Sequence, residues 1–190
     1  PSKKGDMCPA VVEEIALPPP GTKGLKLREV SRRCASFFTD YQKTMMKEKG
    51  SYEDIQVKPY NDPALKDRRN LARLAAKMAA ADMLVSTHEC KGTVALFTVV
   101  KKWARDERGT WNRTSRLIFD ERKANFRWRA PPWCSLGAGT SLGLLDASEE
   151  IHQGFAIRPA VGDIPDYYYR LHLPDEMAEH FCLEGITASE

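Results

Sequence analysis

Apolar and polar positions follow two different periods along the chain, and the change of period separates helical from extended parts. In residues 25–49, apolar side chains recur at helical spacing until Gly50, which predicts one helix there. A clearer helix is predicted at about residues 64–84, where Asp62 can cap it and Pro63 fits its first turn. The apolar face of this second helix consists of Leu71, Leu74, Ala75 and Met78.

The pattern then changes to that of strands. Residues 92–102, GTVALFTVVKK, form an apolar, β-branched run that predicts a strand. Residues 116–125, RLIFDERKAN, alternate between faces and predict a second strand. The polar residues 103–115, with Gly109 among them, predict a turn, so the two strands are expected to form a hairpin with a long, basic tip.

The two ends of the chain are less regular. We expect a frayed N-terminus followed by a stiff linker at the LPPPG run, residues 17–21. After a proline-rich bend, the pattern predicts a short helix from about Thr140 and a strand at residues 154–163. Residues 174–183 are predicted to form a helical turn that passes into a strand.

These elements predict an α+β fold with three parts. Residues 1–62 form an N-terminal extension with a linker and a helix. Residues 63–139 form a helix with a basic hairpin, and residues 140–190 begin a third part that carries the candidate carboxylates.

Composition narrows the class of protein. Hydrophobic residues make up 42% of the 190 residues, enough for a buried core. No apolar run reaches the ~18 residues that span a bilayer, and the first residues lack the apolar segment of a signal peptide. We therefore expect an intracellular protein, in the cytoplasm or the nucleus, without a membrane partner. The five cysteines are scattered, and neither they nor the histidines show the spacing of a zinc site, which favours reduced thiols.

Charge is strongly segregated along the chain. Residues 101–129 carry ten Lys or Arg and four Asp or Glu, whereas residues 146–190 carry two Lys or Arg and ten Asp or Glu. Two solvated faces of opposite sign would explain the pattern. It also suits a cleft in which cations hold phosphates on one wall and carboxylates hold a metal ion on the other.

Two of those carboxylates, Asp163 and Asp166, stand at the end of the strand predicted at residues 154–163. A strand that ends at Asp163 and turns at Pro165 would bring both to one cleft. Rigidly held carboxylates of this kind bind the divalent ions of phosphoryl transfer, and an acidic turn is the alternative. The three tyrosines at residues 167–169 suit either core packing or a ring beside a nucleotide sugar.

In their order and spacing, these segments resemble the fingers and the early palm of reverse transcriptases, most closely those of retroelements. The likeness covers about residues 63–186. The returning strand of that family's fingers hairpin is matched by Arg116, Leu117, Ile118, Asp120, Arg122 and Asn125. Its first catalytic palm motif is matched by Asp163, Asp166, Tyr168, Leu171 and Leu173.

The resemblance implies roles for single residues. Asp163 would be the catalytic carboxylate and would ligate Mg²⁺ together with the Ile164 carbonyl. The residues expected to bind the deoxynucleoside triphosphate are Arg116, Lys101, Lys102, Asp166 and Tyr168, the last as the ring under the incoming sugar. The residues expected to contact an RNA or DNA template with its primer are Arg113, Arg122 and Lys123.

The sequence thus predicts part of an RNA-directed DNA polymerase, a nucleotidyltransferase, truncated after the first palm motif. No paired-aspartate turn like the family's second palm motif occurs in the chain, so we expect this fragment to be inactive alone. A non-catalytic retroelement relic or a nucleic-acid-binding module is the alternative. A viral RNA-directed RNA polymerase is a weaker one, because the Tyr168 ring would oppose a 2′-hydroxyl.

Overall fold

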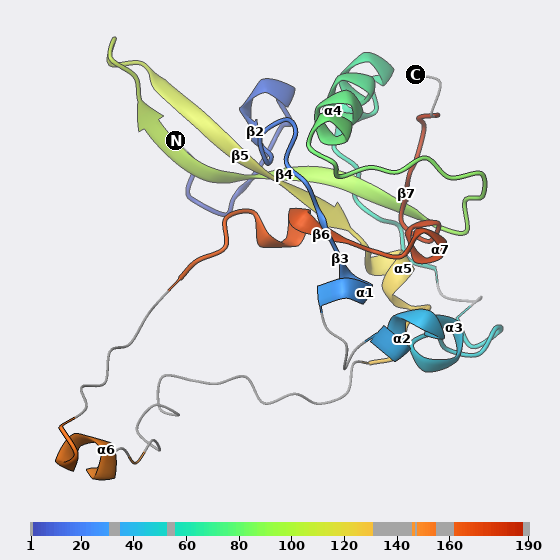
Figure 1. The fold of residues 1–190 in the computed structure, drawn as a ribbon. Coiled ribbons are helices and arrows are strands. Elements are labelled where there is room, and N and C mark those ends of the chain that lie inside the picture. Colours follow the sequence, from blue (N-terminus) through green and yellow to red (C-terminus); the bar gives the residue numbers. More distant parts are fainter. Residues whose placement is uncertain are drawn as a thin grey trace. The chain divides into compact units, whose positions relative to one another are not determined.

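The computed structural model describes residues 2–30, 35–52, 56–130, 146, 148–154 and 162–187. The chain divides into two compact units, one made of Pro1–Arg129 and Asp166–Glu190 and the other of Ala130–Pro165. In the second unit the described residues form one helix, α6 (Ser148–His152). The first unit contains both helices and a mixed sheet, which agrees with the predicted α+β class (Figure 1).

A long antiparallel hairpin is the centre of the first unit. It consists of β4 (Thr93–Arg105) and β5 (Trp111–Asp120), with a bulge between Val100 and Lys102. The turn between them is short because the Asp106 carboxylate accepts hydrogen bonds from the amides of Arg108 and Thr110. The hairpin tip projects away from the rest of this unit (Figure 1).

The hairpin confirms the first predicted strand and corrects the second. The turn predicted over residues 103–115 is too long, because the strands continue on both sides of residues 106–110. The strand predicted at residues 116–125 ends at Asp120, and α5 (Arg122–Asn125) follows it. The chain leaves the strand at Asp120 because its buried carboxylate binds the Arg122 guanidinium and the Arg122 amide.

Short strands from distant parts of the chain flank the hairpin. β1 (Met7–Cys8) pairs antiparallel with β4, and β2 (Ile15–Ala16), which follows the 3₁₀ helix η1 (Val12–Glu14), pairs parallel with β5. The expectation of a frayed N-terminus is therefore wrong for residues 7–16. These residues are ordered by burial of Ala10, Val12 and Ile15 in the core.

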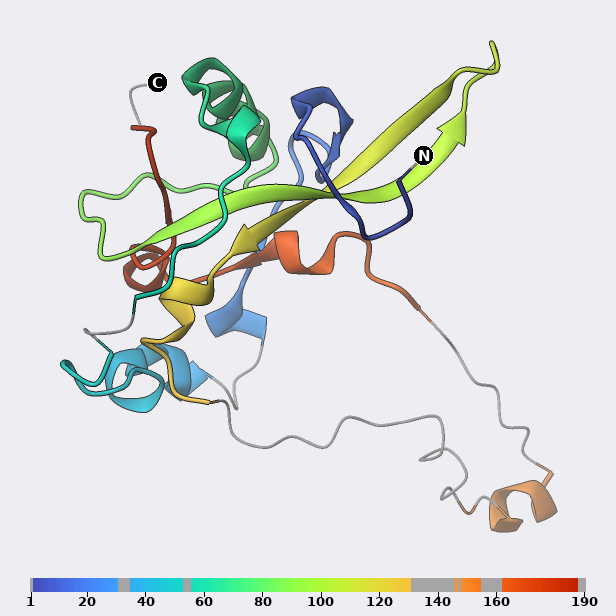
Figure 2. The ribbon, with the colours of Figure 1, turned by 180° about the vertical axis from the view of Figure 1, so that it is seen from behind.

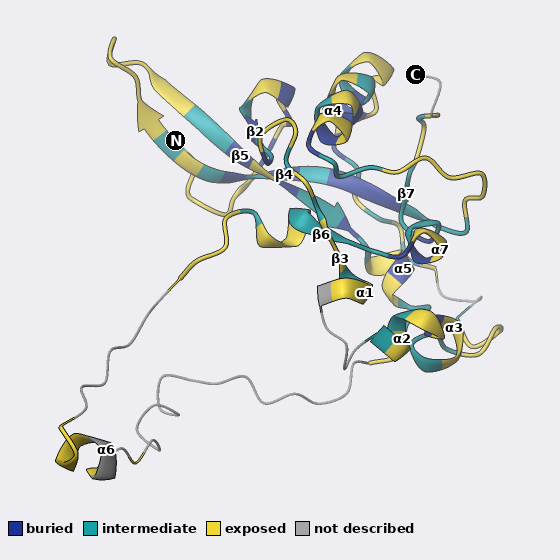
Figure 3. Cartoon of the chain, in the orientation of Figure 1, coloured by how far each residue is buried: buried dark blue, intermediate teal, exposed yellow. Residues whose placement is uncertain are grey.

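Helix α4 (Arg68–Ala80) covers one face of the hairpin and forms the core with it (Figure 3). The predicted apolar face of Leu71, Leu74, Ala75 and Met78 is buried, as expected. The helix is shorter than predicted, because Asp62 caps a separate 3₁₀ turn, η2 (Pro63–Leu65), and Asp67 caps α4 itself.

The single helix predicted over residues 25–49 is wrong. The described part of this range contains a strand, β3 (Leu25–Lys26), and three short helices, α1 (Leu27–Val30), α2 (Ala35–Thr39) and α3 (Tyr41–Thr44). Asp40, between α2 and α3, has non-helical dihedral angles. The apolar side chains of this range thus keep a helical spacing although they belong to several short elements and not to one continuous helix.

The C-terminal segment returns to the sheet. The 3₁₀ helix η4 (Tyr167–Arg170) leads into β6 (Leu171–His172), which pairs with β3. Helix α7 (Asp175–Ala178) and β7 (Cys182–Leu183) follow, as predicted for residues 174–183, and β7 pairs parallel with β4. The helix expected from Thr140 and most of the strand expected at residues 154–163 lie outside the described residues.

Among the helices of the described ranges, none is both long and apolar enough to cross a membrane.

Candidate functional site

The hairpin and the segment that begins at Asp166 meet in the first unit. Lys101 Nζ lies 3.8 Å from Asp166 Oδ1, and the two side chains are 35% and 26% exposed. Figures 1 and 2 show η4, which starts directly after Asp166, on the opposite side of the hairpin from α4. Two residues expected at one nucleotide site, far apart in sequence, are therefore in contact.

Tyr169 fixes η4 against the hairpin. Its hydroxyl donates a hydrogen bond of 2.7 Å to the Leu117 carbonyl, and its ring packs edge-on against Phe119. Burial raises the pKa of Tyr169, the Arg116 cation lowers it and the Asp166 carboxylate raises it. Arg116 and Asp166, both expected to bind the nucleotide, thus both act electrostatically on this one tyrosine. The sequence interpretation did not single out Tyr169, although its place among three tyrosines was visible.

The other two tyrosines face outward. Tyr168 is 85% exposed and Tyr167 is 45% exposed, and their rings meet edge to face with centroids 5.4 Å apart. Asp166 turns the chain here with a left-handed φ of 55°. Tyr169 is thus partly buried against the hairpin, whereas Tyr168 is not packed in the core and its ring is open to a ligand.

The expected metal ligands lie in the second unit. Asp163 and Ile164 are both exposed, in a segment without helix or strand. Within the described ranges, no group of three or more His, Cys, Asp or Glu side chains could hold a metal ion. A carboxylate and a carbonyl are nevertheless oxygen donors that suit Mg²⁺, which usually takes one or two carboxylates and completes its shell with phosphates and water. The magnesium site stays a prediction.

Two of the arginines expected to bind nucleic acid have carboxylate partners within the chain. Arg113 Nε donates to Glu14 at 2.6 Å, and its Nη2 donates to the Pro9 carbonyl at 2.9 Å. Arg122 donates to both oxygens of Asp120, at 2.8 and 2.7 Å. These hydrogen bonds from the Arg122 guanidinium are the largest of the causes that lower the pKa of Asp120 to about 2. Arg113 therefore connects β5 to the N-terminal segment, whereas Arg122 holds the start of α5 to the end of β5. The nucleic-acid contacts of both arginines stay predictions.

Other cations along the hairpin are exposed. Lys102 follows the bulge in β4, and Arg116 lies opposite Val99 on β5. Arg105 lies over the Trp111 ring, with its guanidinium carbon 4.7 Å from the ring centroid. Guanidinium forks and exposed rings are the groups that bind phosphates and stack on bases. The outer hairpin thus presents a basic surface that includes the exposed Trp111 ring.

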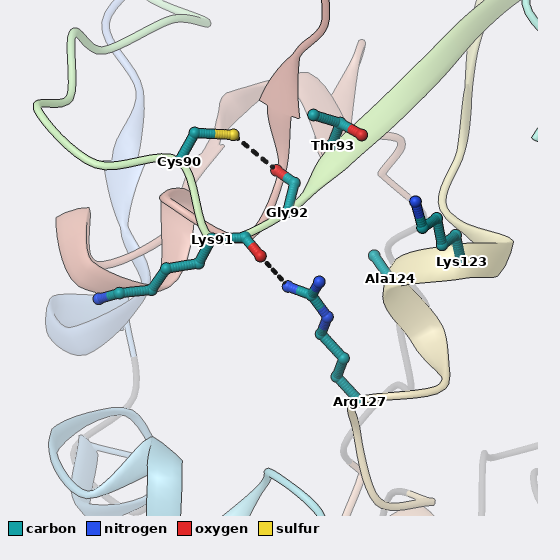
Figure 4. Close-up of a pocket in the computed structure, with 7 residues that line it drawn as sticks. All are labelled: Cys90, Lys91, Gly92, Thr93, Lys123, Ala124 and Arg127. Atoms are coloured by element: carbon teal, nitrogen blue, oxygen red, sulfur yellow. Dashed lines mark hydrogen bonds between the residues drawn. The ribbon is translucent and has the colours of Figure 1, made fainter. Parts of the chain in front are cut away.

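A cavity of about 150 Å³ lies at the inner end of β4 (Figure 4). Its cationic lining residues are Lys91, Lys123 and Arg127. Arg127 donates to the Lys91 carbonyl, and Lys91 forms an ion pair with Glu179. The first cause that raises the pKa of Lys91 is its hydrogen bond to that carboxylate. Of the residues at this cavity, the sequence interpretation had named Lys123, which is exposed.

Comparison with protein families, with curated proteins and with solved structures finds no match to this chain.

Proposed function

We propose that this chain supplies the fingers and the start of the palm of an RNA-directed DNA polymerase, a nucleotidyltransferase that adds deoxynucleotides to a primer. The observation that supports the proposal is the contact between Lys101 and Asp166, with Arg116 close by. Two motifs that the sequence resemblance assigns to one nucleotide site converge on one side of the hairpin. This convergence does not follow from the sequence spacing alone.

The residues around this contact have complementary roles. The Arg116 guanidinium can hold two phosphate oxygens of a triphosphate at once, and Lys101 adds a point charge. Asp166 orients Lys101 until the nucleotide arrives. The exposed Tyr168 ring is available to lie under the sugar, where its bulk would exclude a 2′-hydroxyl.

Asp163 and the Ile164 carbonyl would hold Mg²⁺ in the proposed enzyme. Magnesium ions in phosphoryl transfer stabilise charge on the attacking and leaving oxygens. Within the described ranges, no three or more His, Cys, Asp or Glu side chains gather into a group that could hold a metal ion, and no paired-aspartate turn occurs in the sequence. We therefore expect this chain by itself to bind nucleotides without extending a primer.

Equilibrium binding of a deoxynucleoside triphosphate to this chain in Mg²⁺, measured by calorimetry, tests the proposal. Arg116→Ala should weaken binding about tenfold, because it removes a charged hydrogen-bond donor worth roughly 1.4 kcal/mol or more. Lys66→Ala is the matched control, since Lys66 is an exposed cation at the end of η2, just before α4, and is not among the residues expected at the nucleotide site. Equal affinities of the Arg116 variant and the unaltered chain would remove the nucleotide site.

The exposed Lys102 and the Arg105–Trp111 pair favour a second candidate, a nucleic-acid-binding module without catalysis. Binding of a primer–template at several salt concentrations distinguishes the two. Each lost phosphate contact should reduce the log–log salt slope by about 0.9. If Lys102→Ala flattens this slope while no nucleotide binds, the module is the better description.

A further inference from the structure

Two cysteines meet where the C-terminal segment returns to the hairpin. The Cys182 amide donates a hydrogen bond of 2.9 Å to the Gly92 carbonyl at the start of β4. The Cys90 thiol contacts the same carbonyl oxygen at 3.6 Å (Figure 4). The pairing of Thr93 with Cys182 keeps β7 at this place. The Cys182 thiol contacts the Glu179 carbonyl at 3.4 Å, and this carbonyl also accepts the amides of Lys91 and Gly92, which follow Cys90. Both thiols therefore lie at the start of β4.

The attachment of this returning segment is slight. β7 contributes two register pairs to the sheet, Thr93 with Cys182 and Val94 with Leu183. Beside them, the amides of Lys91 and Gly92 both donate to the Glu179 carbonyl, at 2.8 and 3.2 Å. A covalent bond at this point would hold the segment more firmly than these few hydrogen bonds, because it prevents separation of the two strands.

We propose that Cys90 and Cys182 are a reversible thiol–disulfide pair that locks α7 and β7 onto the start of β4 under oxidising conditions. The oxidant is a low-molecular-weight disulfide such as oxidised glutathione. The Cys90 thiolate attacks it, forms a mixed disulfide and releases one small thiol. The Cys182 thiolate then attacks the Cys90 sulfur, forms the protein disulfide and releases the second small thiol. Two protein thiols are oxidised, one small disulfide is reduced, and the protons pass to the two leaving thiolates.

Exposure and acidity set this order of attack. Cys90 is exposed, whereas Cys182 is partly buried. Burial raises the pKa of the Cys182 thiol to about 11, and the neighbouring Cys90 adds to the increase. The thiolate is the attacking species, so Cys90 reacts first. Once Cys90 is in a mixed disulfide, its own contribution to the raised pKa of Cys182 is removed while the contribution of burial remains, so the attack by Cys182 is the slower step.

Oxidation of the purified chain with oxidised glutathione, followed by tryptic digestion without reductant, tests the pair. We expect peptide 78–91 linked to peptide 171–190. Cys90→Ser and Cys182→Ser should each abolish the linked product. Cys8→Ser is the control and should leave it unchanged, because Cys8 is buried against Thr98 and Ser115. Glutathione retained on Cys90, or a bond from Cys90 to Cys34 or Cys134, would overturn the assignment.

Hydrogen exchange of single amides tests the lock separately. The amides of Lys91, Gly92 and Cys182 hold the segment, so oxidation should slow their exchange at least tenfold. The Arg108 amide at the hairpin tip should exchange at an unchanged rate. If the disulfide forms and the three amides exchange as before, the cysteines are a redox pair without a locking role.

Discussion

Replacing Asp120 by Asn tests how strongly the inner end of the hairpin is held. The Asp120 carboxylate is buried, accepts both bonds of the Arg122 fork, and accepts a further bond of 2.7 Å from the Tyr60 amide. These contacts, the Arg122 hydrogen bonds first, lower the pKa of Asp120 from 3.8 to about 2. Each pKa unit is worth about 1.4 kcal/mol, so the charged carboxylate stabilises the fold by about 2 kcal/mol at neutral pH.

The pH dependence follows from the sign of that change. Because the folded-state pKa lies below the unfolded one, the stabilisation is complete above the unfolded pKa of 3.8 and is lost as the pH falls toward about 2. Urea unfolding followed by circular dichroism should show Asp120→Asn destabilised by about 2 kcal/mol at neutral pH. Its stability should also decline less than that of the unaltered chain between about pH 4 and about pH 2.

An exposed carboxylate serves as the control for this experiment. Glu107 lies at the hairpin tip, and Glu107→Gln should change stability by less than about 0.5 kcal/mol. The reasoning is refuted if Asp120→Asn and Glu107→Gln change the unfolding free energy equally. It is also refuted if the stability of Asp120→Asn falls as much as that of the unaltered chain between about pH 4 and about pH 2. Arg122→Ala should likewise lower stability more than it lowers affinity for a primer–template, because its guanidinium is bound to Asp120.

Four further outcomes are expected. Arg113→Ala should lower the unfolding free energy by about 2 kcal/mol in urea titrations, because it removes charged hydrogen bonds to Glu14 and Pro9. An unchanged unfolding free energy would contradict the role of Arg113 in holding β5 to the N-terminal segment. Burial lowers the pKa of His180, so stability should fall as the pH drops below about 6.5, and His180→Asn should weaken this decline. In a full-length enzyme, Tyr168→Ala should admit ribonucleotides, measured as the ratio of kcat/KM values, whereas Tyr167→Ala should not. There, Asp163→Asn should abolish extension while primer–template binding persists; near-normal extension would remove Asp163 from the metal site.

The sequence predicts elements whose signal is local and misses those that depend on distant partners. α4 and the hairpin carry long, uniform periods, so their buried faces could be assigned in advance. β1 and β2 are two residues each and exist through pairing with β4 and β5 far along the chain. No local pattern marks such short strands. In residues 25–49 the spacing was helical, yet a periodic pattern does not reveal where the axis breaks.

The same distinction applies to the candidate site. From the order of the motifs, Lys101, Arg116 and Asp166 were expected to bind one nucleotide. The structure pairs Lys101 with Asp166, and Arg116 acts on the neighbouring Tyr169. Which arginines already have partners could not be predicted, because the Glu14 that binds Arg113 is distant in sequence. Tyr169 was likewise indistinguishable from its two neighbours until its hydroxyl was found on the Leu117 carbonyl.

The cations of the hairpin differ in how firmly a carboxylate of the chain holds them, and therefore in how readily they can bind a phosphate. The side chain of Arg113 is 14% exposed in its pair with Glu14, and releasing it would leave a half-buried carboxylate without a partner. Lys101 and Asp166 are more exposed and 3.8 Å apart, and pairs of this kind contribute only about 0–1 kcal/mol. Lys101 can therefore exchange Asp166 for a phosphate at little cost. The weak ion pair is thus the one best suited to open for a nucleotide, and it lies beside Arg116 and directly before the exposed tyrosines.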